Sequence, residues 1–179
     1  MAELSEAVIA RSLWNDYGVG QWACANIHYY AFESDLLILR NSGTVVEYEI
    51  KLSVSDFRAG LKKKQIISPY NKNRRVNKIH KNQKYITRHE YLTKGLGANM
   101  FYYVAPDEVI SRVDIPEWAG IIRVAPNNSA NVCSRVLKKR ARKLHKKKAS
   151  EVMKEKIMTS CYYKYWRNYA VKDLEAKHA

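Results

Sequence analysis

Several common signals are missing from this sequence, and each absence excludes a class of protein. The chain has 179 residues and three cysteines, Cys24, Cys133 and Cys161, too few and too widely spaced for a disulfide-rich secreted domain. No apolar run reaches the ~18 residues that a bilayer-spanning helix needs. The acidic stretch from Met1 to Glu6 has no basic or apolar signal segment. We therefore expect a cytoplasmic protein.

Acidic charge is also scarce in this chain. It holds 17 acidic against 32 basic residues, a formal net charge of +15. Such an excess predicts a polyanionic partner: nucleic acid, DNA before RNA, is the first expectation and an anionic membrane surface the second.

The sequence contains no Gly-x-x-x-x-Gly-Lys phosphate loop and no zinc finger, recognition helix or RNA-binding sheet motif. It therefore predicts neither an ATPase of that type nor a reader of base sequence.

The hydrophobic pattern predicts an α/β (α+β) fold with a mixed β-sheet flanked by helices. Expected helices cover residues 4–14, 56–67, 73–91, 107–112, 137–148 and 151–169, and expected strands lie within 22–39 and over 45–54, 99–104 and 119–124. We place a core domain at residues 1–128. A basic helical C-terminal extension follows at residues 129–179, packed on or next to the core.

Residues 45–54 alternate between apolar and polar side chains, which predicts a strand with one buried face. The turn signal at residues 41–43 precedes this strand, and Gly43 suits the left-handed position that ends a three-residue hairpin loop. Counting back along both strands from that loop places Asp35 opposite Glu49, with Cβ atoms roughly 5 Å apart. The turn therefore predicts a pair of carboxylates on one face of the sheet.

The polar face of this strand carries Glu47, Glu49, Lys51 and Ser53. It is either a solvated surface or a site where carboxylates bind a cation. The pairing of Asp35 with Glu49 and the positive charge of the chain favour the second interpretation. Carboxylate oxygens suit Mg²⁺ or Mn²⁺, which also bind phosphate oxygens. Lys51 lies ~7 Å beyond Glu49 on the same face, within reach of a phosphate at such a site.

Asp35, followed fourteen residues later by Glu49-Ile50-Lys51, resembles the signature of the PD-(D/E)XK nuclease superfamily, with Ser34 where the motif name has Pro. The order of elements over roughly residues 3–125 also resembles the restriction-endonuclease-like fold, above all its DNA-repair-type and phage members, which implies a microbial or infected host cell. The resemblance implies that Asp35, Glu49 and the Ile50 carbonyl hold Mg²⁺ or Mn²⁺, and that Lys51 is the catalytic lysine.

The same resemblance assigns roles to polar residues on either side of the motif. Glu6, on the first helix, is implied as an auxiliary catalytic acid, and Glu3 is the rival for that role. Ser53 and Asp56 resemble the polar pair that often follows the lysine, which places Ser53 near bound nucleic acid.

Two basic segments are the expected nucleic-acid contacts. Residues 58–94 hold twelve Lys or Arg residues and one acid, Glu90, and residues 135–148 hold nine without an acid. The second segment is either a helix along a nucleic-acid backbone or a flexible basic arm. The predicted contacts are Lys62, Lys63, Lys64, Arg74, Arg75, Lys78, Lys81, Lys84, Arg88, Lys138, Lys139, Arg140, Arg142 and Lys143.

These patterns favour a metal-dependent DNA nuclease, and specifically an endonuclease. The alternative is a non-catalytic nucleic-acid-binding regulator or inhibitor on the same fold. An RNA-binding or ribosome-associated protein would use the basic segments but leaves Asp35 and Glu49 unexplained. Five aromatic residues between 162 and 169 either pack against the domain or stack on unpaired bases.

Overall fold

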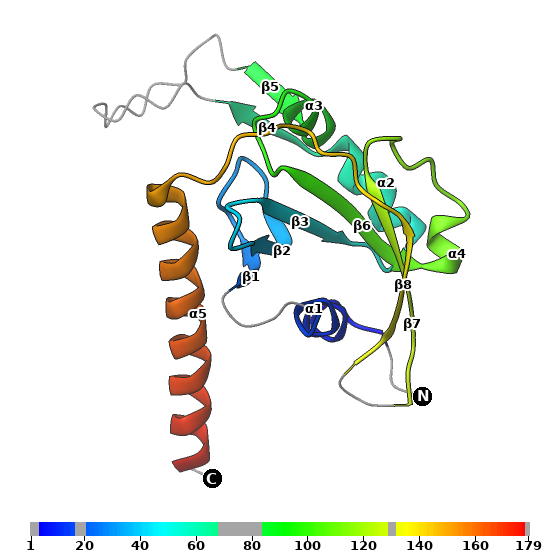
Figure 1. Cartoon of the computed structure of the whole chain (residues 1–179). Coiled ribbons are helices and arrows are strands. Elements are labelled where there is room, and N and C mark those ends of the chain that lie inside the picture. The colour runs from blue at the N-terminus through cyan, green and yellow to red at the C-terminus, as the bar shows by residue number, and fades with distance from the viewer. Residues whose placement is uncertain (1–3, 17–20, 68–83, 129–131, 178–179) are drawn as a thin grey trace.

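A six-stranded mixed sheet forms the centre of the molecule (Figure 1). The computed structural model describes residues 4–16, 21–67, 84–128 and 132–177. The sheet contains, in spatial order, β1 (Trp22–Ile27), β2 (Ser34–Leu39), β3 (Val45–Ile50), β6 (Met100–Pro106), β7 (Gly120–Ala125) and β8 (Ser134–Lys139). β3 and β7 run parallel to β6, and the other neighbours are antiparallel. The predicted α/β class with a mixed sheet is confirmed.

Helices cover both faces of this sheet (Figure 1). Ile9 and Leu13 of α1 (Glu6–Trp14) pack on the face formed by the even-numbered residues of β2 and β3. Phe57 of α2 (Val54–Lys62), Leu92 of α3 (Arg88–Thr93) and Val109 of α4 (Asp107–Ile110) pack on the other face, over β6. α5 (Glu151–Lys177) covers β1 and the end of β2 on that second face.

Local signals fix the two elements on either side of the predicted carboxylate pair. Gly43 has φ +77°, and the Arg40 N–H donates to the Thr44 carbonyl at 2.9 Å, so the predicted three-residue hairpin is confirmed. The β2–β3 register pairs Leu36 with Tyr48, which puts Asp35 opposite Glu49. Ser53 begins α2 as its N-cap and accepts the Asp56 N–H at 3.1 Å, because a side-chain oxygen satisfies a free helix N–H.

The two helices predicted after this strand are partly wrong. α2 ends at Lys62, and the next residues form β4 (Lys64–Ile67), paired antiparallel with β5 (Lys84–Thr87) in a separate two-stranded sheet. β-branched residues, which favour strands over helices, end β4 and β5. The first part of the second predicted helix, residues 73–83, lies outside the described residues.

Two alternatives were predicted for the second basic segment, a helix and a flexible arm, and the structure shows neither of them over residues 137–148. Residues 134–139 are β8, which pairs with β7 at the edge of the main sheet, so the sheet itself crosses the predicted domain boundary at residue 128. Residues 140–149, which we call the basic strap, run without regular structure from β8 to α5 (Figure 1). The buried Asn99 holds this strap, because its Nδ2 donates to the carbonyls of His145 and Lys147 at 3.1 and 2.6 Å.

One close approach in the fold requires glycine. A Cβ on Gly120 would lie 2.2 Å from the ring of Tyr102 and 2.7 Å from the backbone nitrogen of Ala141 in the strap. Tyr102 in turn stacks on Tyr48, with ring centroids 5.4 Å apart.

Among the described residues, no helix combines the length and apolar character needed to cross a bilayer.

Candidate functional site

An open cavity of about 560 Å³ lies where β2, β3, α2 and the start of α3 meet. The hairpin register brings Asp35 and Glu49 there, and Lys51 follows directly after β3. The other residues that line it are Glu33, Asp56, Ala59, Gly60, Lys62, Lys63 and Arg88. Three residues of the predicted catalytic set therefore share one cavity, with the two exposed lysines Lys62 and Lys63 beside them.

Asp35 is half-buried beside the last residue of β3. Its Oδ2 accepts the backbone N–H of Ile50 at 2.7 Å. Burial raises the pKa of Asp35 above its ordinary value, although the hydrogen bond from Ile50 and the charge of Lys51 oppose the shift. Because Lys51 N–H donates to Val104 of β6, we expect the carbonyl of the preceding Ile50 to face β2 and Asp35.

Lys51 is buried, and its ammonium bridges two carboxylates. Its Nζ lies 3.1 Å from Glu49 Oε1 and 3.2 Å from Asp56 Oδ1. Gly60, on the side of α2 that faces the cavity, leaves room for this approach, since a Cβ there would lie 3.3 Å from Lys51 Cε, closer than most Cβ contacts. The ammonium is held at the wall of the cavity, where it can reach an anionic group of a bound ligand.

Arg88, predicted as a nucleic-acid contact, is instead part of this site. Its exposed fraction is 9%, too small for a groove-binding side chain. Nη1 donates to Glu49 Oε2 and lies 3.5 Å from Glu47 Oε1, while Nη2 donates to the Glu33 carbonyl at 2.5 Å. The guanidinium carbon also lies 5.3 Å from the centre of the Phe32 ring, a cation–π distance. Arg88 is buried because two buried carboxylates need a counter-charge.

Glu47 was not a predicted site residue, yet it is the most buried carboxylate of the group, with 2% exposed. Burial raises its pKa, and the charge of Arg88 opposes that shift. Its position on the same alternating face as Glu49 was the available signal. The sequence pattern gave no reason to connect it with Arg88, which is 41 positions later.

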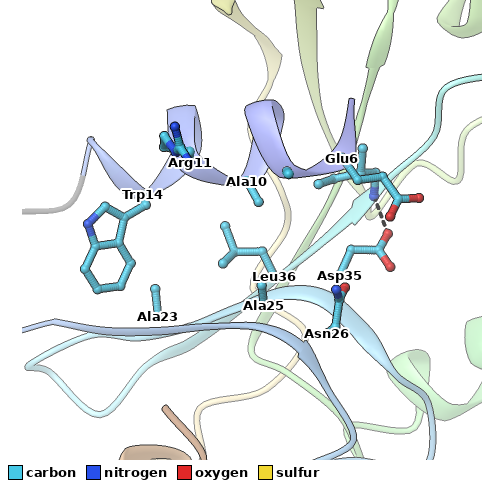
Figure 2. Close-up of a pocket in the computed structure, with 11 residues that line it drawn as sticks. Glu6, Ala10, Arg11, Trp14, Ala23, Ala25, Asn26, Asp35 and Leu36 are labelled. Atoms are coloured by element: carbon cyan, nitrogen blue, oxygen red, sulfur yellow. Dashed lines mark hydrogen bonds between the residues drawn. The ribbon is translucent and has the colours of Figure 1, made fainter. Parts of the chain in front are cut away.

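Glu6 is exposed at the start of α1 and lies near Asp35, as Figure 2 shows. The two carboxylates line a second cavity of about 410 Å³ between α1 and β1. Burial and the nearby charge of Asp35 raise the pKa of Glu6. The predicted role for Glu6 at this site is therefore geometrically possible. Its rival, Glu3, lies outside the described residues.

The other predicted contacts divide into three groups. The Ser53 hydroxyl caps α2, and Lys139 donates to the Pro116 carbonyl at 3.2 Å. Exposed side chains belong to Lys62, Lys63, Lys64, Lys138, Arg140, Arg142 and Lys143. Arg74, Arg75, Lys78 and Lys81 lie outside the described residues, and Lys84 is placed only by its backbone in β5.

α3 owes its start to a capping box that also positions Arg88. The Thr87 hydroxyl accepts the Glu90 N–H at 3.2 Å, and Glu90 Oε2 accepts the Thr87 N–H at 2.9 Å. These hydrogen bonds lower the pKa of Glu90. Above the ordinary Glu pKa of 4.5 the carboxylate is charged and the capping box is complete, and the box is lost as the pH falls through the lowered pKa of Glu90. The Thr-x-x-Glu spacing was a signal in the sequence for a helix beginning at Arg88.

Removing this cap should weaken α3 measurably. We expect Thr87→Val, which keeps the β-branched shape but loses the hydroxyl, to lower the free energy of unfolding by about 1 kcal/mol at neutral pH. Urea denaturation measures the change, and Thr93→Val, at the other end of α3, is the matched control. Equal stabilities of Thr87→Val and the wild type would show that the box does not hold α3.

The donors of this site suit a hard divalent cation in type but are already engaged. Both oxygens of Glu49 contact cations, Lys51 and Arg88, and within the described ranges no group of three His, Cys, Asp or Glu side chains stands ready to hold a metal. Asp35, Glu49 and the Ile50 carbonyl would hold Mg²⁺ or Mn²⁺ once Lys51 or Arg88 releases an oxygen of Glu49.

Comparison with known proteins relates this chain to an uncharacterised fold neighbour. No family model and no curated protein matches the sequence. Among solved structures, the SPO1766 protein of unknown function from Silicibacter pomeroyi is similar, with a TM-score of 0.55 and 16% sequence identity. The similarity covers 95% of this chain and 89% of that one, so the two share the overall fold.

Proposed function

We propose that this chain is a metal-dependent DNA endonuclease on a restriction-endonuclease-like sheet. The observation that carries the proposal is the convergence of Asp35, Glu49 and Lys51 in one open cavity, in the register that the hairpin dictates. Two carboxylates that can hold a divalent cation, beside a lysine that can contact a phosphate, are one set of groups that can hydrolyse a phosphodiester. Bound Mg²⁺ or Mn²⁺ would activate water and offset charge on the attacked phosphate.

The residues of the chain have distinct roles in this proposal. Lys51 stabilises the negative charge that builds on the phosphate, because its ammonium is held in place by Glu49 and Asp56 before the substrate arrives. Asp35 and Glu49 supply the oxygen ligands. Glu6, whose pKa is raised, lies beside Asp35 to exchange a proton with the reacting groups.

A cleavage assay tests this proposal directly. Purified protein is incubated with supercoiled plasmid, linear duplex, single-stranded and branched DNA in Mg²⁺, in Mn²⁺ and in EDTA. We expect nicking or cutting that needs the divalent ion and stops in EDTA. The absence of cutting on every substrate in both ions would refute the nuclease.

The ion pair of Arg88 with Glu49 favours a second candidate function, a non-catalytic DNA-binding regulator. A carboxylate that is neutralised internally by arginine binds metal weakly and repels phosphate little. In that case no substrate is cut, and Glu49→Gln leaves DNA affinity unchanged. In the nuclease, the same variant loses metal-dependent cutting.

Lys62 and Lys63 supply the phosphate contacts nearest to the cavity in both functions. Each phosphate neutralised by a basic side chain contributes about 0.9 to the slope of log affinity against log salt. We expect Lys62→Ser with Lys63→Ser to reduce the slope for duplex DNA by about 2. Fluorescence anisotropy at several salt concentrations measures it.

The matched control for this pair is Lys94→Ser with Arg112→Ser, which removes the same charge from exposed positions outside the cavity. An equal fall in slope for both double variants would show that the lysines act only through net charge.

A further inference from the structure

Three cavities adjoin one another between the candidate site and α5. Asp35 lines both the site cavity and the cavity of about 410 Å³ between α1 and β1. Trp14 and Ala23 line this second cavity and also a third, of about 600 Å³, which α5 completes. Figure 2 shows Trp14 at one end of α1 and Glu6, near Asp35, at the other. We call the second and third cavities, which share Trp14 and Ala23 along α1, the α1 groove, and Asp35 lies at its boundary with the site cavity.

The far end of the α1 groove is aromatic and exposed. Trp14, Trp22 and Tyr163 line it, with exposed fractions of 46%, 40% and 67%. Packing against the domain does not account for side chains that remain this open to water. Exposed apolar surface of this kind marks an interaction site. Tryptophan and tyrosine rings are also the side chains on which nucleic-acid bases stack.

Positive charge accompanies these rings. Arg11 lines the α1 groove between Trp14 and Glu6, and Lys164 of α5 donates to the carbonyls of Ala25 and Asn26 in β1. A second copy of a chain with a formal charge of +15 would be repelled from such a surface, whereas a polyanion is attracted. The groove thus combines one arginine and several aromatic faces on a chain whose net positive charge attracts a polyanion.

The backbone of β1 is also unusual in the α1 groove. Asn26 has φ +50°, a left-handed conformation, and it interrupts the ladder between Ala25 and Ile27. This residue lines the groove beside Asp35, as Figure 2 shows. Sparsely populated backbone conformations are concentrated at ligand sites. Asn26 presents its amide to the groove at the point where the strand of a substrate would reach the carboxylates.

We infer that the α1 groove binds an unpaired DNA strand and leads it to Asp35. Bases within a duplex are already stacked on their neighbours, so Trp14, Trp22 and Tyr163 can stack only on unpaired or end bases. The substrate class is therefore DNA with a single-stranded segment, such as a flap, a branch or a frayed end. This inference deepens the proposed nuclease, but strand binding itself does not require cleavage.

Binding in EDTA tests the groove without the chemistry. The probe is a labelled oligothymidine of about 16 nucleotides, followed by anisotropy and compared with a duplex of equal length. We expect tighter binding of the oligothymidine. Trp14→Leu and Tyr163→Leu, which keep apolar bulk but lose the aromatic face, should each weaken it about tenfold and leave duplex affinity unchanged.

Two controls separate stacking from general effects. Trp14→Phe keeps an aromatic face and should retain most of the affinity for oligothymidine. Tyr85→Leu changes an aromatic side chain of β5 that is 59% exposed and lies outside the three cavities, and it should have no effect. Far-ultraviolet circular dichroism of each variant checks that the fold is intact.

Two results would overturn the inference. One is equal affinity of wild type for oligothymidine and duplex, or a parallel loss of both in Trp14→Leu. The other is a dimer, detected by sedimentation, that Trp14→Leu dissociates, which would assign the groove to a second copy. Selective oligothymidine binding without any cutting in Mg²⁺ or Mn²⁺ would refute the nuclease and leave the groove assignment standing.

Discussion

Lys51→Met is expected to abolish metal-dependent cutting of DNA while the protein stays folded and binds DNA. Methionine keeps the apolar stem of the lysine and removes the ammonium that lies between Glu49 and Asp56. Glu49 retains Arg88 as a counter-charge, so the loss of Lys51 does not leave an isolated buried carboxylate. Removing one preorganised donor to a developing oxyanion costs about 10²–10³ in rate, and we expect a loss in that range or beyond.

Lys63→Met is the matched control for this prediction. It removes a positive charge from an exposed residue that lines the same cavity, so it reports the effect of charge alone. We expect weaker binding of DNA but cutting within about tenfold of wild type at saturating DNA. Initial rates on supercoiled plasmid in Mg²⁺ measure both variants. A folded Lys51→Met protein that cuts as fast as wild type would contradict the assignment of this site.

Arg88→Ala is expected to be the most destabilising single change at the site. It leaves Glu47 without its counter-charge and Glu49 with Lys51 alone, both in surroundings where less than a tenth of each side chain is exposed. Breaking a buried ion pair on one side costs about 3–5 kcal/mol, because an uncompensated charge remains. The contacts of Arg88 with the Phe32 and Phe101 rings are lost as well.

A double variant identifies the cause of this loss. If the unpaired carboxylate is responsible, Glu47→Gln in the Arg88→Ala background should recover part of the stability, so that the two changes are not additive. Urea denaturation of the wild type, both single variants and the double variant gives the coupling energy. Arg142→Ala, an exposed arginine in the basic strap, is the control for charge. A loss below about 1 kcal/mol for Arg88→Ala would show that Arg88 is a surface-type ion pair.

Local chemistry made much of the site predictable. Gly43 fixes the hairpin, the hairpin fixes the register, and the register places Asp35 opposite Glu49. Ser5 and Ser53 begin the helices on either side of the site through hydrogen bonds to residues three positions later. Each of these signals depends on a few neighbouring residues, so a sequence is sufficient to recognise it.

The errors at Arg88 and at β8 came from charged residues, because a sequence does not define what surrounds a charged side chain in the fold. In a basic run, the sequence does not distinguish a lysine on an edge strand, such as Lys138, from a lysine on a helix. Arg88 looked like one more exposed cation, but contacts with Glu47 and Phe101 from distant strands bury it. β8 was missed because an edge strand with a largely solvated surface lacks clear alternation, and Lys or Arg residues are common there.

Two elements that complete this fold, β8 and α5, come last among the elements of the chain, which determines when the fold can be completed during synthesis. β1 and β2 are made early, yet their outer apolar face is covered by Met153 and Ile157 of α5. β7 likewise waits for β8 as its neighbour. A nascent chain that has reached residue 128 therefore presents an open strand edge and a bare apolar surface, both of which promote aggregation. The sheet and its cover are therefore complete only after residues 132–177 have been made.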